Sequence, residues 1–400
     1  MERFDVVVVG AGLSGLRMAG LLAGEGLSVL VTDRKTDPTH AVHTTGIFVR
    51  RTLESFPLPE TCLGPPIRRV TLFSPSGRRS TFQSHHDEFR IGRIAALYER
   101  ELDTAAAAGA VWAAGHNFEG IECLHRDTLV ELRDQDGRPR IVRTRFLVGA
   151  DGTFSAVARA LRLDRNTEWL AATELVLPGS ALDCEPQLMC FLDPRLAPGY
   201  IGWVAHDGHE THVGVGGLAG RFDPAQTLGE FLGKAAATLA RDGVLGDPAA
   251  FTAVGMERRG GCIPIGGMLR RIAGTRGLLV GDAAGAPSPL TAGGLDPCFR
   301  LSTVATEAIV DHLVRDDQGL LETYSGDRFR PRFASRLIMR RLLTALDDPR
   351  VLEAVCVSLR IFPAWSIARA VFFGANSFPG EPCEGRATAR LAWNSTDGTR

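Results

Sequence analysis

The sequence of 400 residues has almost no net charge, no long apolar run and no grouped cysteines. A formal net charge of −1 provides no overall attraction to nucleic acid, so we expect no nucleic-acid partner. No apolar run reaches the roughly eighteen residues that span a bilayer, and the N-terminus lacks the basic region, apolar core and cleavage site of an export signal. We therefore expect a cytoplasmic protein with no membrane-spanning helix.

Metal and disulfide sites are also poorly supported. The eight cysteines show no CxxC pair and no metal-ligand spacing. His206, His209 and His212 straddle an Asp207-Gly208 turn, where strand alternation would not point all three at one spot. We expect neither a disulfide framework nor a metal site.

What the sequence does have is a glycine turn at its start. The apolar run 4–9, FDVVVV, leads directly into Gly10-Ala11-Gly12-Leu13-Ser14-Gly15. A buried strand, a GxGxxG turn and a helix in that order form the usual site for a dinucleotide pyrophosphate. We expect the unpaired amides at the helix start to face the phosphates. The expected cofactor contacts in this turn are Gly10, Gly12, Leu13, Ser14 and Gly15.

A second strand, expected over 28–32, ends at Asp33. An acid at this spacing would bond a ribose hydroxyl, so Asp33 and its neighbour Arg34 are predicted cofactor contacts. NAD and FAD carry the same ADP half, and this part of the sequence does not separate them.

Further elements follow from periodicity and turn residues. The sequence predicts strands within 68–83 and over 128–133, 140–148 and 278–280, and helices over 91–108, 228–240 and 296–314. Between 166 and 261, short alternating segments with many Gly and Pro breaks predict an antiparallel sheet covered by the helix at 228–240.

Two motifs then reveal a family. The segment 146–159, with Asp151 and Gly152, resembles the "DG" motif of FAD proteins with the p-hydroxybenzoate hydroxylase fold. The segment 281–294, with Pro289 and Gly293-Gly294, resembles their "GD" motif. The resemblance implies FAD as cofactor and a Rossmann-like α/β FAD-binding domain, with an inserted antiparallel β-sheet substrate domain and a C-terminal helical region.

The second motif also makes physical sense for a flavin. Asp282 at the end of a buried strand can accept hydrogen bonds from a ribityl chain. Asp296 suits a helix N-cap and Pro297 the first helical position, so the helix is expected to begin just past Gly294 and Leu295. Its N-terminus would stabilise negative charge at flavin N1 and the C2 oxygen.

Within this fold the chain looks most like the geranylgeranyl reductase branch. The segment 198–204, with Tyr200 and Trp203, is similar to the branch's PxxYxW strand, and 211–216 to its glycine-rich partner strand. The resemblance implies substrate contacts for Tyr200 and Trp203. Arg93 matches an arginine that lies by the flavin pyrophosphate or ribityl; a surface arginine at a helix start is the equal alternative.

One segment departs from the branch, which usually carries a CGG-type sequence near the flavin. The corresponding residues here are His43-Thr44-Thr45-Gly46. Alkene reduction needs a proton donor besides hydride, and a threonine hydroxyl is a poor acid. Thr44, Thr45 and His43 are nevertheless the candidate catalytic residues, with Thr45 also a predicted cofactor contact.

The resemblance also divides the chain. We expect an FAD-binding domain at 1–67, 88–165 and 262–325, a substrate domain at 68–87 and 166–261, a C-terminal helical segment at 326–379 and a flexible tail at 380–400. Arginines from 328 to 341 predict an amphipathic helix that could touch anionic lipid at the membrane periphery, although packing on the core explains it better. Phe362, Trp365, Phe372, Phe373 and Phe378 could roof a lipophilic cavity, and ordinary helix packing explains them equally well.

Three functions remain open. The first is an FAD-dependent oxidoreductase that reduces carbon-carbon double bonds of an isoprenoid or related lipid, with NAD(P)H or another electron donor as transient reductant. The second is a flavin monooxygenase that hydroxylates an aromatic or polyketide substrate, which depends less on a protein acid. The third is a non-catalytic prenyl-binding protein; intact flavin motifs argue against it.

Overall fold

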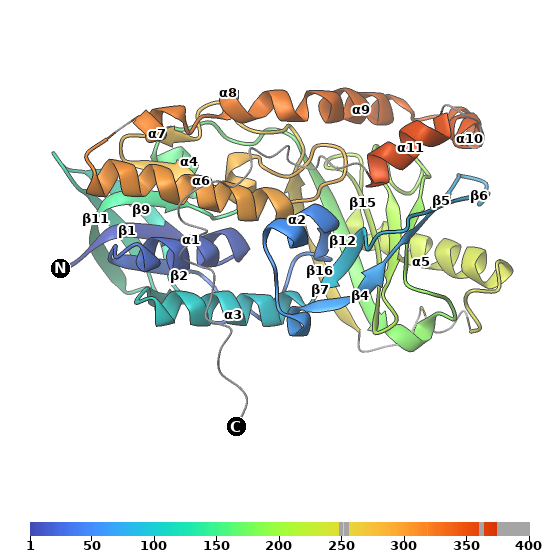
Figure 1. Ribbon diagram of the computed structural model, residues 1–400, viewed down its shortest axis with the longest axis horizontal. Coiled ribbons are helices and arrows are strands. Elements are labelled where there is room, and N and C mark those ends of the chain that lie inside the picture. Colours follow the sequence, from blue (N-terminus) through green and yellow to red (C-terminus); the bar gives the residue numbers. More distant parts are fainter. Residues whose placement is uncertain (248–250, 252–255, 318, 360–363, 374–400) are drawn as a thin grey trace.

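The computed structural model describes the chain except residues 248–250, 252–255, 318, 360–363 and 374–400. Two lobes lie side by side, with the N-terminal strands in one lobe and the helix α5 in the other (Figure 1). The C-terminal helices run along one side of both lobes (Figure 1).

The first lobe is built on a parallel sheet. β1 (Glu2–Val9) lies between β2 (Val29–Asp33) and β11 (Pro139–Gly149) and is parallel to both. The sheet continues in the order β17-β18-β11-β1-β2-β8, and β9 and β10 extend it through β11. These outer strands are β8 (Val111–Ala114), β9 (Asn117–Cys123), β10 (Thr128–Arg133), β17 (Ala273–Gly274) and β18 (Gly277–Leu279).

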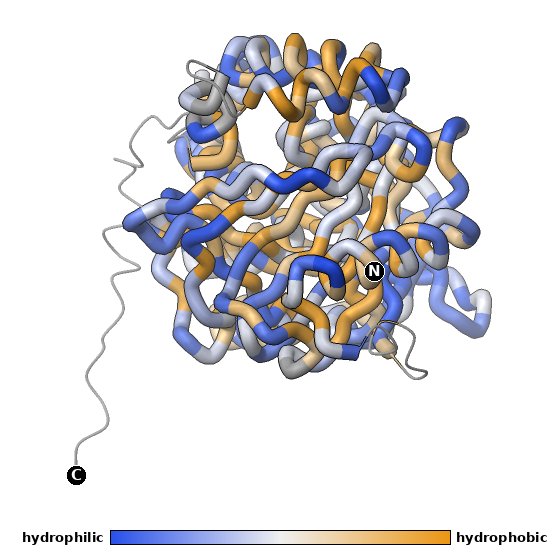
Figure 2. Tube along the Cα trace, turned by 90° about the vertical axis from the view of Figure 1, so that its right-hand side faces the viewer, coloured by the Kyte–Doolittle hydropathy of each residue, from blue (hydrophilic) through white to orange (hydrophobic). Residues whose placement is uncertain are grey.

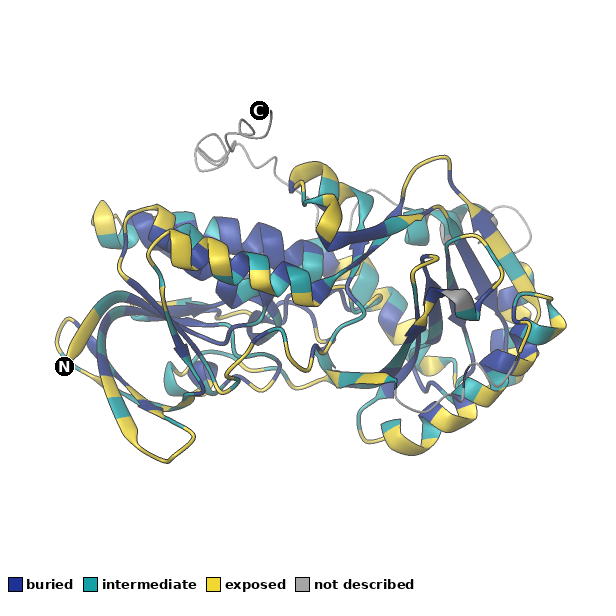
Figure 3. Cartoon of the chain, turned by 90° about the horizontal axis from the view of Figure 1, so that it is seen from below, coloured by how far each residue is buried: buried dark blue, intermediate teal, exposed yellow. Residues whose placement is uncertain are grey.

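Helices cover this sheet because its strands are apolar on both faces. Val6, Val7 and Val8 are fully buried, as strands of a two-sided parallel sheet must be. α1 (Leu13–Gly24) packs against both α3 (Ile94–Ala107) and α6 (Leu295–Val314). α3 has an exposed outer face, whereas α1 and α6 are almost entirely buried or half-buried, and Figure 3 shows exposed residues along the outer side of the lobe's helices. The short helix α4 (Ala156–Ala160) packs on β11.

The second lobe holds a seven-stranded sheet in the order β16-β12-β15-β14-β13-β5-β6. Its pairs are antiparallel except β13 with β5, which are parallel. The strands are β5 (Arg69–Phe73), β6 (Arg79–Gln83), β12 (Trp169–Pro178), β13 (Gln187–Phe191), β14 (Gly202–His206), β15 (Glu210–Leu218) and β16 (Glu257–Pro264). Hydrophobic residues are concentrated in the interior and hydrophilic residues at many of the outer turns (Figure 2).

α5 (Pro224–Arg241) covers this sheet through Phe231 and Leu239, which are buried among residues of β13 to β15. Asp223 caps the helix by accepting hydrogen bonds from the amides of Ala225 and Gln226. A third sheet, of order β3-β7-β4, joins the lobes. It consists of β3 (Ile47–Val49), β4 (Leu63–Ile67) and β7 (Phe89–Gly92), flanked by α2 (Arg50–Ser55) and the turn Glu60–Cys62.

The remaining helical elements complete the described chain. They are the short turns Gly179–Ala181 and Gly281–Ala284, then α7 (Gly319–Thr323), α8 (Gly326–Phe329), the turn Arg330–Phe333, α9 (Ala334–Ala345), α10 (Pro349–Ser358) and α11 (Ala364–Phe373). Among the helices that the structure describes, none is long and apolar enough to cross a membrane.

The mixed α/β fold expected from the sequence is confirmed, and the predicted helix at 228–240 and strands at 128–133 are found there. Two details were wrong. The helix expected from 91 begins at Ile94, because Phe89–Gly92 pairs as β7. Asp296 does not cap α6, whose cap is Gly294; its carboxylate instead accepts hydrogen bonds from Thr52 and Arg300.

Candidate functional site

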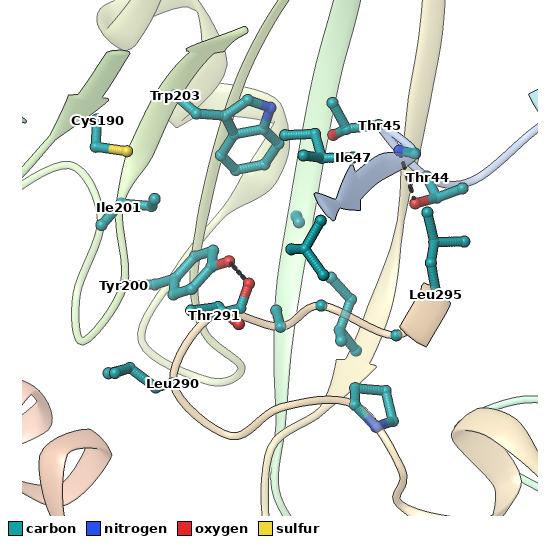
Figure 4. Close-up of a pocket in the computed structure, with 18 of the residues that line it drawn as sticks. Thr44, Thr45, Ile47, Cys190, Tyr200, Ile201, Trp203, Leu290, Thr291 and Leu295 are labelled. Atoms are coloured by element: carbon teal, nitrogen blue, oxygen red, sulfur yellow. Dashed lines mark hydrogen bonds between the residues drawn. The ribbon is translucent and has the colours of Figure 1, made fainter. Parts of the chain in front are cut away.

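A cavity of about 880 Å³ lies between the two lobes. That volume is within the range of small-molecule and cofactor sites. Residues of both flavin-family motif segments, 146–159 and 281–294, line the cavity, as do Tyr200 and Trp203 of the second lobe. Figure 4 shows part of the site, with Thr44, Thr45 and Leu295 on one side and Trp203 and Tyr200 on the other.

The glycine turn has the geometry that a pyrophosphate requires. Gly10 has φ +103°, and a Cβ there would lie 2.3 Å from the Ala150 carbonyl oxygen. A Cβ on Gly15 would lie 1.8 Å from the Gly10 oxygen, so both positions need glycine to let the elements approach. A Cβ on Gly12 would meet no other atom within 4 Å, and Gly12 lines the cavity.

The helix that follows this turn begins without a side-chain cap, since Gly12 is its N-cap residue. Its first amides and dipole are therefore available to an anion. Leu13 and Ser14 of this first turn also line the cavity, and Ser14 donates a hydrogen bond to the Cys298 sulfur over 3.0 Å. These features fit the pyrophosphate of FAD.

Asp33 lies at the end of β2 as expected, but behind the cavity lining. Its oxygens accept hydrogen bonds from the backbone amides of Ala11 (2.7 Å) and Lys35 (2.9 Å). The carboxylate thereby holds the glycine turn against β2. Arg34 is exposed, and among the described residues neither Asp33 nor Arg34 lines the cavity.

In the motif segment 146–159, Gly152 lines the cavity and Asp151 does not. The Asp151 carboxylate accepts hydrogen bonds from the Ser155 hydroxyl (2.6 Å) and from the amides of Ala156 and Val157. It therefore closes the turn before α4. Burial raises the pKa of Asp151, and these hydrogen bonds partly offset the effect.

Asp282 is the ionisable residue of the second motif, and it lines the cavity with Gly293, Gly294 and Leu295. Burial raises its pKa to about 6. Among the described residues, no donor forms a hydrogen bond with its side chain, which leaves a carboxylate in a cavity with open acceptor positions. The hydroxyls of a ribityl chain would satisfy it. Pro289 is buried and packs near Gly267 outside the lining.

Arg93 lies away from this cavity and is engaged elsewhere. Its guanidinium donates to Asp207 and to Glu210, both over 2.8 Å. Both partners belong to the second lobe, so Arg93 joins the start of α3 to the turn between β14 and β15. A charge-assisted pair of this kind fixes one element against another, and it leaves Arg93 outside the described cavity lining.

The segment that replaces the expected cysteine lies in the cavity wall. Thr44 accepts a hydrogen bond from the Gly46 amide over 3.1 Å (Figure 4). His43 also lines the cavity, and its Nδ1 lies 2.9 Å from the Gly260 oxygen. Burial, together with Lys35 and Arg34, lowers the pKa of His43. Thr45 donates to Glu174 over 2.5 Å.

Glu174 is a site residue that the sequence reasoning missed. It lies in the middle of β12, is 3% exposed and lines the cavity. It accepts hydrogen bonds from Thr45 and from the Trp203 indole (3.1 Å), and lies 3.3 Å from His212 Nδ1. A single acid within the apolar strand WLAATELVLP was the available signal.

The two aromatic residues from the family motif stand on the second lobe's wall. Gly214 pairs with Trp203 across β14 and β15, and a Cβ on Gly214 would lie 2.3 Å from the indole. The glycine therefore makes room for the ring. Tyr200 donates its hydroxyl to the Thr291 oxygen over 2.9 Å, which links this wall to the loop before α6 (Figure 4).

Among the described residues, three cysteines line the cavity although none stands at the expected position: Cys190, Cys262 and Cys298. Burial raises the pKa of Cys190 and of Cys298 to about 12 and also raises that of Cys262. Each is therefore a protonated thiol at neutral pH. Their positions in distant segments gave no spacing signal.

The C-terminal helices form one side of the cavity and its opening to the surface. Leu342 on α9 and Val355 on α10 line it while remaining 61% and 36% exposed, so the cavity reaches the surface between these helices. Phe372 and Phe373 line it, in agreement with the first of the two explanations that the sequence left open. The Trp365 side chain, Phe362 and Phe378 lie outside the described residues, as does the segment 380–400.

Two of the arginines of α9 are turned toward the protein, which fits packing on the core, the alternative that the sequence favoured over a cationic face for lipid. Arg336 lines the cavity and donates to the Ser288 hydroxyl over 3.1 Å. Arg340 is 4% exposed, with its guanidinium carbon 5.7 Å from the centre of the Tyr200 ring. Ile338 and Leu342 occupy exposed positions of the helix beside Arg341.

Comparison with known proteins agrees with this geometry. Residues 3–58 match the family described as "FAD binding domain". The chain is 30% identical to digeranylgeranylglycerophospholipid reductase 1 of Methanopyrus kandleri over 368 residues, 88% of this chain and 93% of that protein. It is 30% identical to a menaquinone reductase of Mycobacterium tuberculosis over 369 residues, 87% and 85% of the two.

A solved structure shows the same fold. It is a geranylgeranyl bacteriochlorophyll reductase-like protein from Thermoplasma acidophilum, with a TM-score of 0.77 at 18% identity, covering 94% of this chain and 98% of that one. Fold and site thus define an FAD-dependent oxidoreductase of the p-hydroxybenzoate hydroxylase type. Within that class, the chain belongs to the geranylgeranyl reductase family.

Proposed function

We propose that this enzyme reduces carbon-carbon double bonds of an isoprenoid lipid. The observation that carries the proposal is the cavity itself, which runs from the glycine turn and Asp282 to an aliphatic rim at Leu342 and Val355. A chain of isoprene units fits such a lining, because apolar walls favour a ligand with few polar groups. The names of the two relatives, one acting on a prenylated phospholipid and one on menaquinone, support the same substrate class.

The cofactor contacts follow from the residues that face the cavity. The amides of Gly12, Leu13 and Ser14 would hold the pyrophosphate, and Asp282 would accept hydrogen bonds from the ribityl chain. Gly293, Gly294 and Leu295 would place the uncapped start of α6 at the ring. Reduced FAD supplies hydride to the alkene in this chemistry. NAD(P)H or a small electron carrier would reduce the flavin beforehand.

The residues of the second lobe would bind and orient the lipid. Trp203 and Tyr200 are each held by a hydrogen bond to the protein, so their rings present fixed apolar faces. The lining between them and the rim is made of aliphatic and sulfur side chains: Leu72, Leu188, Cys190, Leu192, Ile201, Met339 and Leu343. This wall would exclude water from the reacting carbons, which also protects reduced flavin from side reactions.

Anaerobic reduction tests the proposal. Purified holoprotein is reduced with dithionite under nitrogen and then mixed with geranylgeranylated lipids, with menaquinone or with oxygen plus aromatic candidates. We expect the flavin absorbance to return with the prenyl lipid or menaquinone and a product two hydrogens heavier. Oxygen-dependent reoxidation with a hydroxylated aromatic product would instead establish the monooxygenase alternative. A colourless protein that does not take up FAD would leave a non-catalytic prenyl-binding role.

A further inference from the structure

A chain of hydrogen-bonded side chains connects the cavity wall to the surface of the second lobe. Thr45 Oγ donates to Glu174 Oε2 over 2.5 Å, and Glu174 Oε1 lies 3.3 Å from His212 Nδ1. The other ring nitrogen, Nε2, lies 3.3 Å from Glu210 Oε2. Three segments that are far apart in the sequence, namely the coil before β3, strand β12 and strand β15, therefore contribute side chains to one hydrogen-bonded chain.

The two ends of this chain lie in different environments. Thr45 and Glu174 line the cavity, and the Glu174 side chain is 4% exposed. The His212 side chain is fully buried, whereas the side chain of Glu210 is 35% exposed. The imidazole thus links a carboxylate in the cavity to a carboxylate in contact with solvent.

The charges around the imidazole favour its protonated form. Both ring nitrogens face carboxylate oxygens, which accept but do not donate, so an imidazolium with two N–H groups satisfies both contacts. Burial alone would lower the pKa of His212, but Glu174 and Glu210 outweigh it and raise the pKa. The hydrogen bond from His212 in turn lowers the pKa of Glu210.

Other ionisable groups near the imidazole do not interrupt the chain. The charged side chains on neighbouring elements include Arg93, Asp207, Glu257, Arg258 and Arg259. Arg258 donates to the Thr173 hydroxyl, and the charge of Arg259 lowers the pKa of His212 without reversing the rise that the two carboxylates cause. Arg93 is paired with Asp207 and Glu210, and Arg259 with Glu257. These pairs hold Glu210 and the end of β16 in position, and no further acid or base among the described residues contacts the ring nitrogens.

We propose that Glu210, His212 and Glu174 form a proton relay into the cavity, with the Thr45 hydroxyl as its outlet to the substrate. The inference rests on the proposed alkene reduction, which consumes one proton from the protein for each hydride added to the other carbon. The imidazolium of His212 gives its Nδ1 proton to Glu174, Glu174 gives a proton to the Thr45 oxygen, and the Thr45 hydroxyl gives its own proton to the substrate carbon, where it forms the new C–H bond. The neutral ring then keeps one proton, on Nε2. Turning of the ring presents this protonated nitrogen to Glu174, and the nitrogen that then faces Glu210 takes up a proton from solvent through that carboxylate.

The relay supplies what the missing family cysteine would otherwise provide. Cys190 lines the cavity and carries a thiol, as the family cysteine does. Burial raises the pKa of Cys190 to about 12, however, and none of the hydrogen bonds among the described residues links it to solvent. A thiol in that setting could give up one proton and not regain it. Glu174 has a route for reprotonation, and Thr45 stands within the segment that replaces the cysteine.

The first test reads the protonation state directly. ¹⁵N-histidine NMR of the holoprotein is recorded from pH 5 to 9, with His212→Asn identifying the signal. We expect the His212 pKa to lie above the ordinary value of about 6.5 and to fall in Glu174→Gln, where one carboxylate is removed. A neutral His212 ring across this range, or a pKa unchanged in Glu174→Gln, would overturn the relay.

The second test measures proton delivery. Reoxidation of the reduced flavin by the alkene is followed by stopped flow across the same pH range in His212→Asn, Glu174→Gln and Thr45→Val. We expect a slowing of roughly a hundredfold, the usual contribution of a positioned acid, and loss of the pH dependence that His212 confers. Thr45→Ser, which keeps the hydroxyl, should restore the rate.

His206→Asn is the matched control. His206 is a buried histidine on β14 whose ring contacts Thr211 and not the relay. It should leave the rate and pH profile unchanged. If wild-type flavin is never reoxidised by the alkene, the proposed function fails and not the relay; if it is reoxidised but the three relay variants match wild type, the relay is wrong.

Discussion

The two walls of the cavity are lined by different kinds of groups. The first lobe contributes backbone and small residues, namely Gly12, Gly152, Gly293 and Gly294, while the second contributes the large side chains of Trp203 and Tyr200 with Glu174 behind them. A cofactor of fixed shape can be held by backbone amides and open space. A substrate has to be selected and supplied with protons, which only side chains can do.

The largest effect should come from filling a glycine of the first wall. In Gly15→Ala, the new Cβ would lie 1.8 Å from the Gly10 oxygen, and neither backbone segment can move away freely. We expect the free energy of unfolding to drop by about 3 kcal/mol or more. Urea denaturation measures it.

Gly12→Ala is the matched variant, because a Cβ there meets nothing within 4 Å. We expect it to fold normally but to purify with little FAD, since the methyl group would occupy the space for the pyrophosphate. If both variants lost the same free energy of unfolding, Gly15 would not differ from Gly12 in being needed for packing, and the distinction between the two glycines would be wrong.

A second large effect concerns Asp282, whose pKa of about 6 in the folded protein lies above the value of 3.8 for an exposed aspartate. Between these values the folded state binds more protons than the unfolded state, so the free energy of unfolding of the apoprotein falls as pH rises. Asp282→Asn should abolish that decline and stabilise the apoprotein at pH 7 by on the order of 2–3 kcal/mol.

The same substitution should weaken FAD binding, because an amide is a poorer acceptor for ribityl hydroxyls than a carboxylate. Thermal unfolding of apoprotein and FAD titration, both from pH 4 to 8, separate the two effects. A variant apoprotein with the wild-type pH profile would contradict the assignment.

On the second wall, Trp203→Phe keeps an aromatic ring but removes the indole donor to Glu174. We expect kcat/KM for the lipid to fall about tenfold, the cost of one hydrogen bond to a charged group, with FAD content unchanged. Flavin absorbance of the purified variant and steady-state rates check both parts. Loss of FAD would mean that the two walls are not independent.

The smallest effect is expected behind Tyr200. Arg340 is 4% exposed, and in the part of the chain that the structure describes its guanidinium nitrogens have no hydrogen-bonding partner. Burial lowers its pKa. Arg340→Met should therefore raise the free energy of unfolding by about 1 kcal/mol, whereas Arg341→Met, at an exposed position of the same helix, should not. A destabilised Arg340→Met would indicate that the cation has a ligand.

The same contrast explains what the sequence could predict. The glycine turn at 10–15 and the strand before it are local, so their spacing is sufficient to identify them. Asp282 was found for the same reason. The partners of Arg93 and Thr45 lie 114 to 129 residues away along the chain, and no local pattern encodes such contacts. Arg93 was therefore placed near the cofactor by its motif, although the structure pairs it with the second lobe.

The seven-stranded sheet has a consequence for synthesis of the chain. β5 and β6 are synthesised early. β13, which pairs with β5 in parallel, begins only at Gln187. During translation the apolar edge with Val70, Leu72 and Phe73 therefore waits for roughly one hundred further residues to leave the ribosome, an interval in which unpaired strands invite aggregation. Production in a heterologous host should accordingly respond to growth temperature and to co-expressed chaperones.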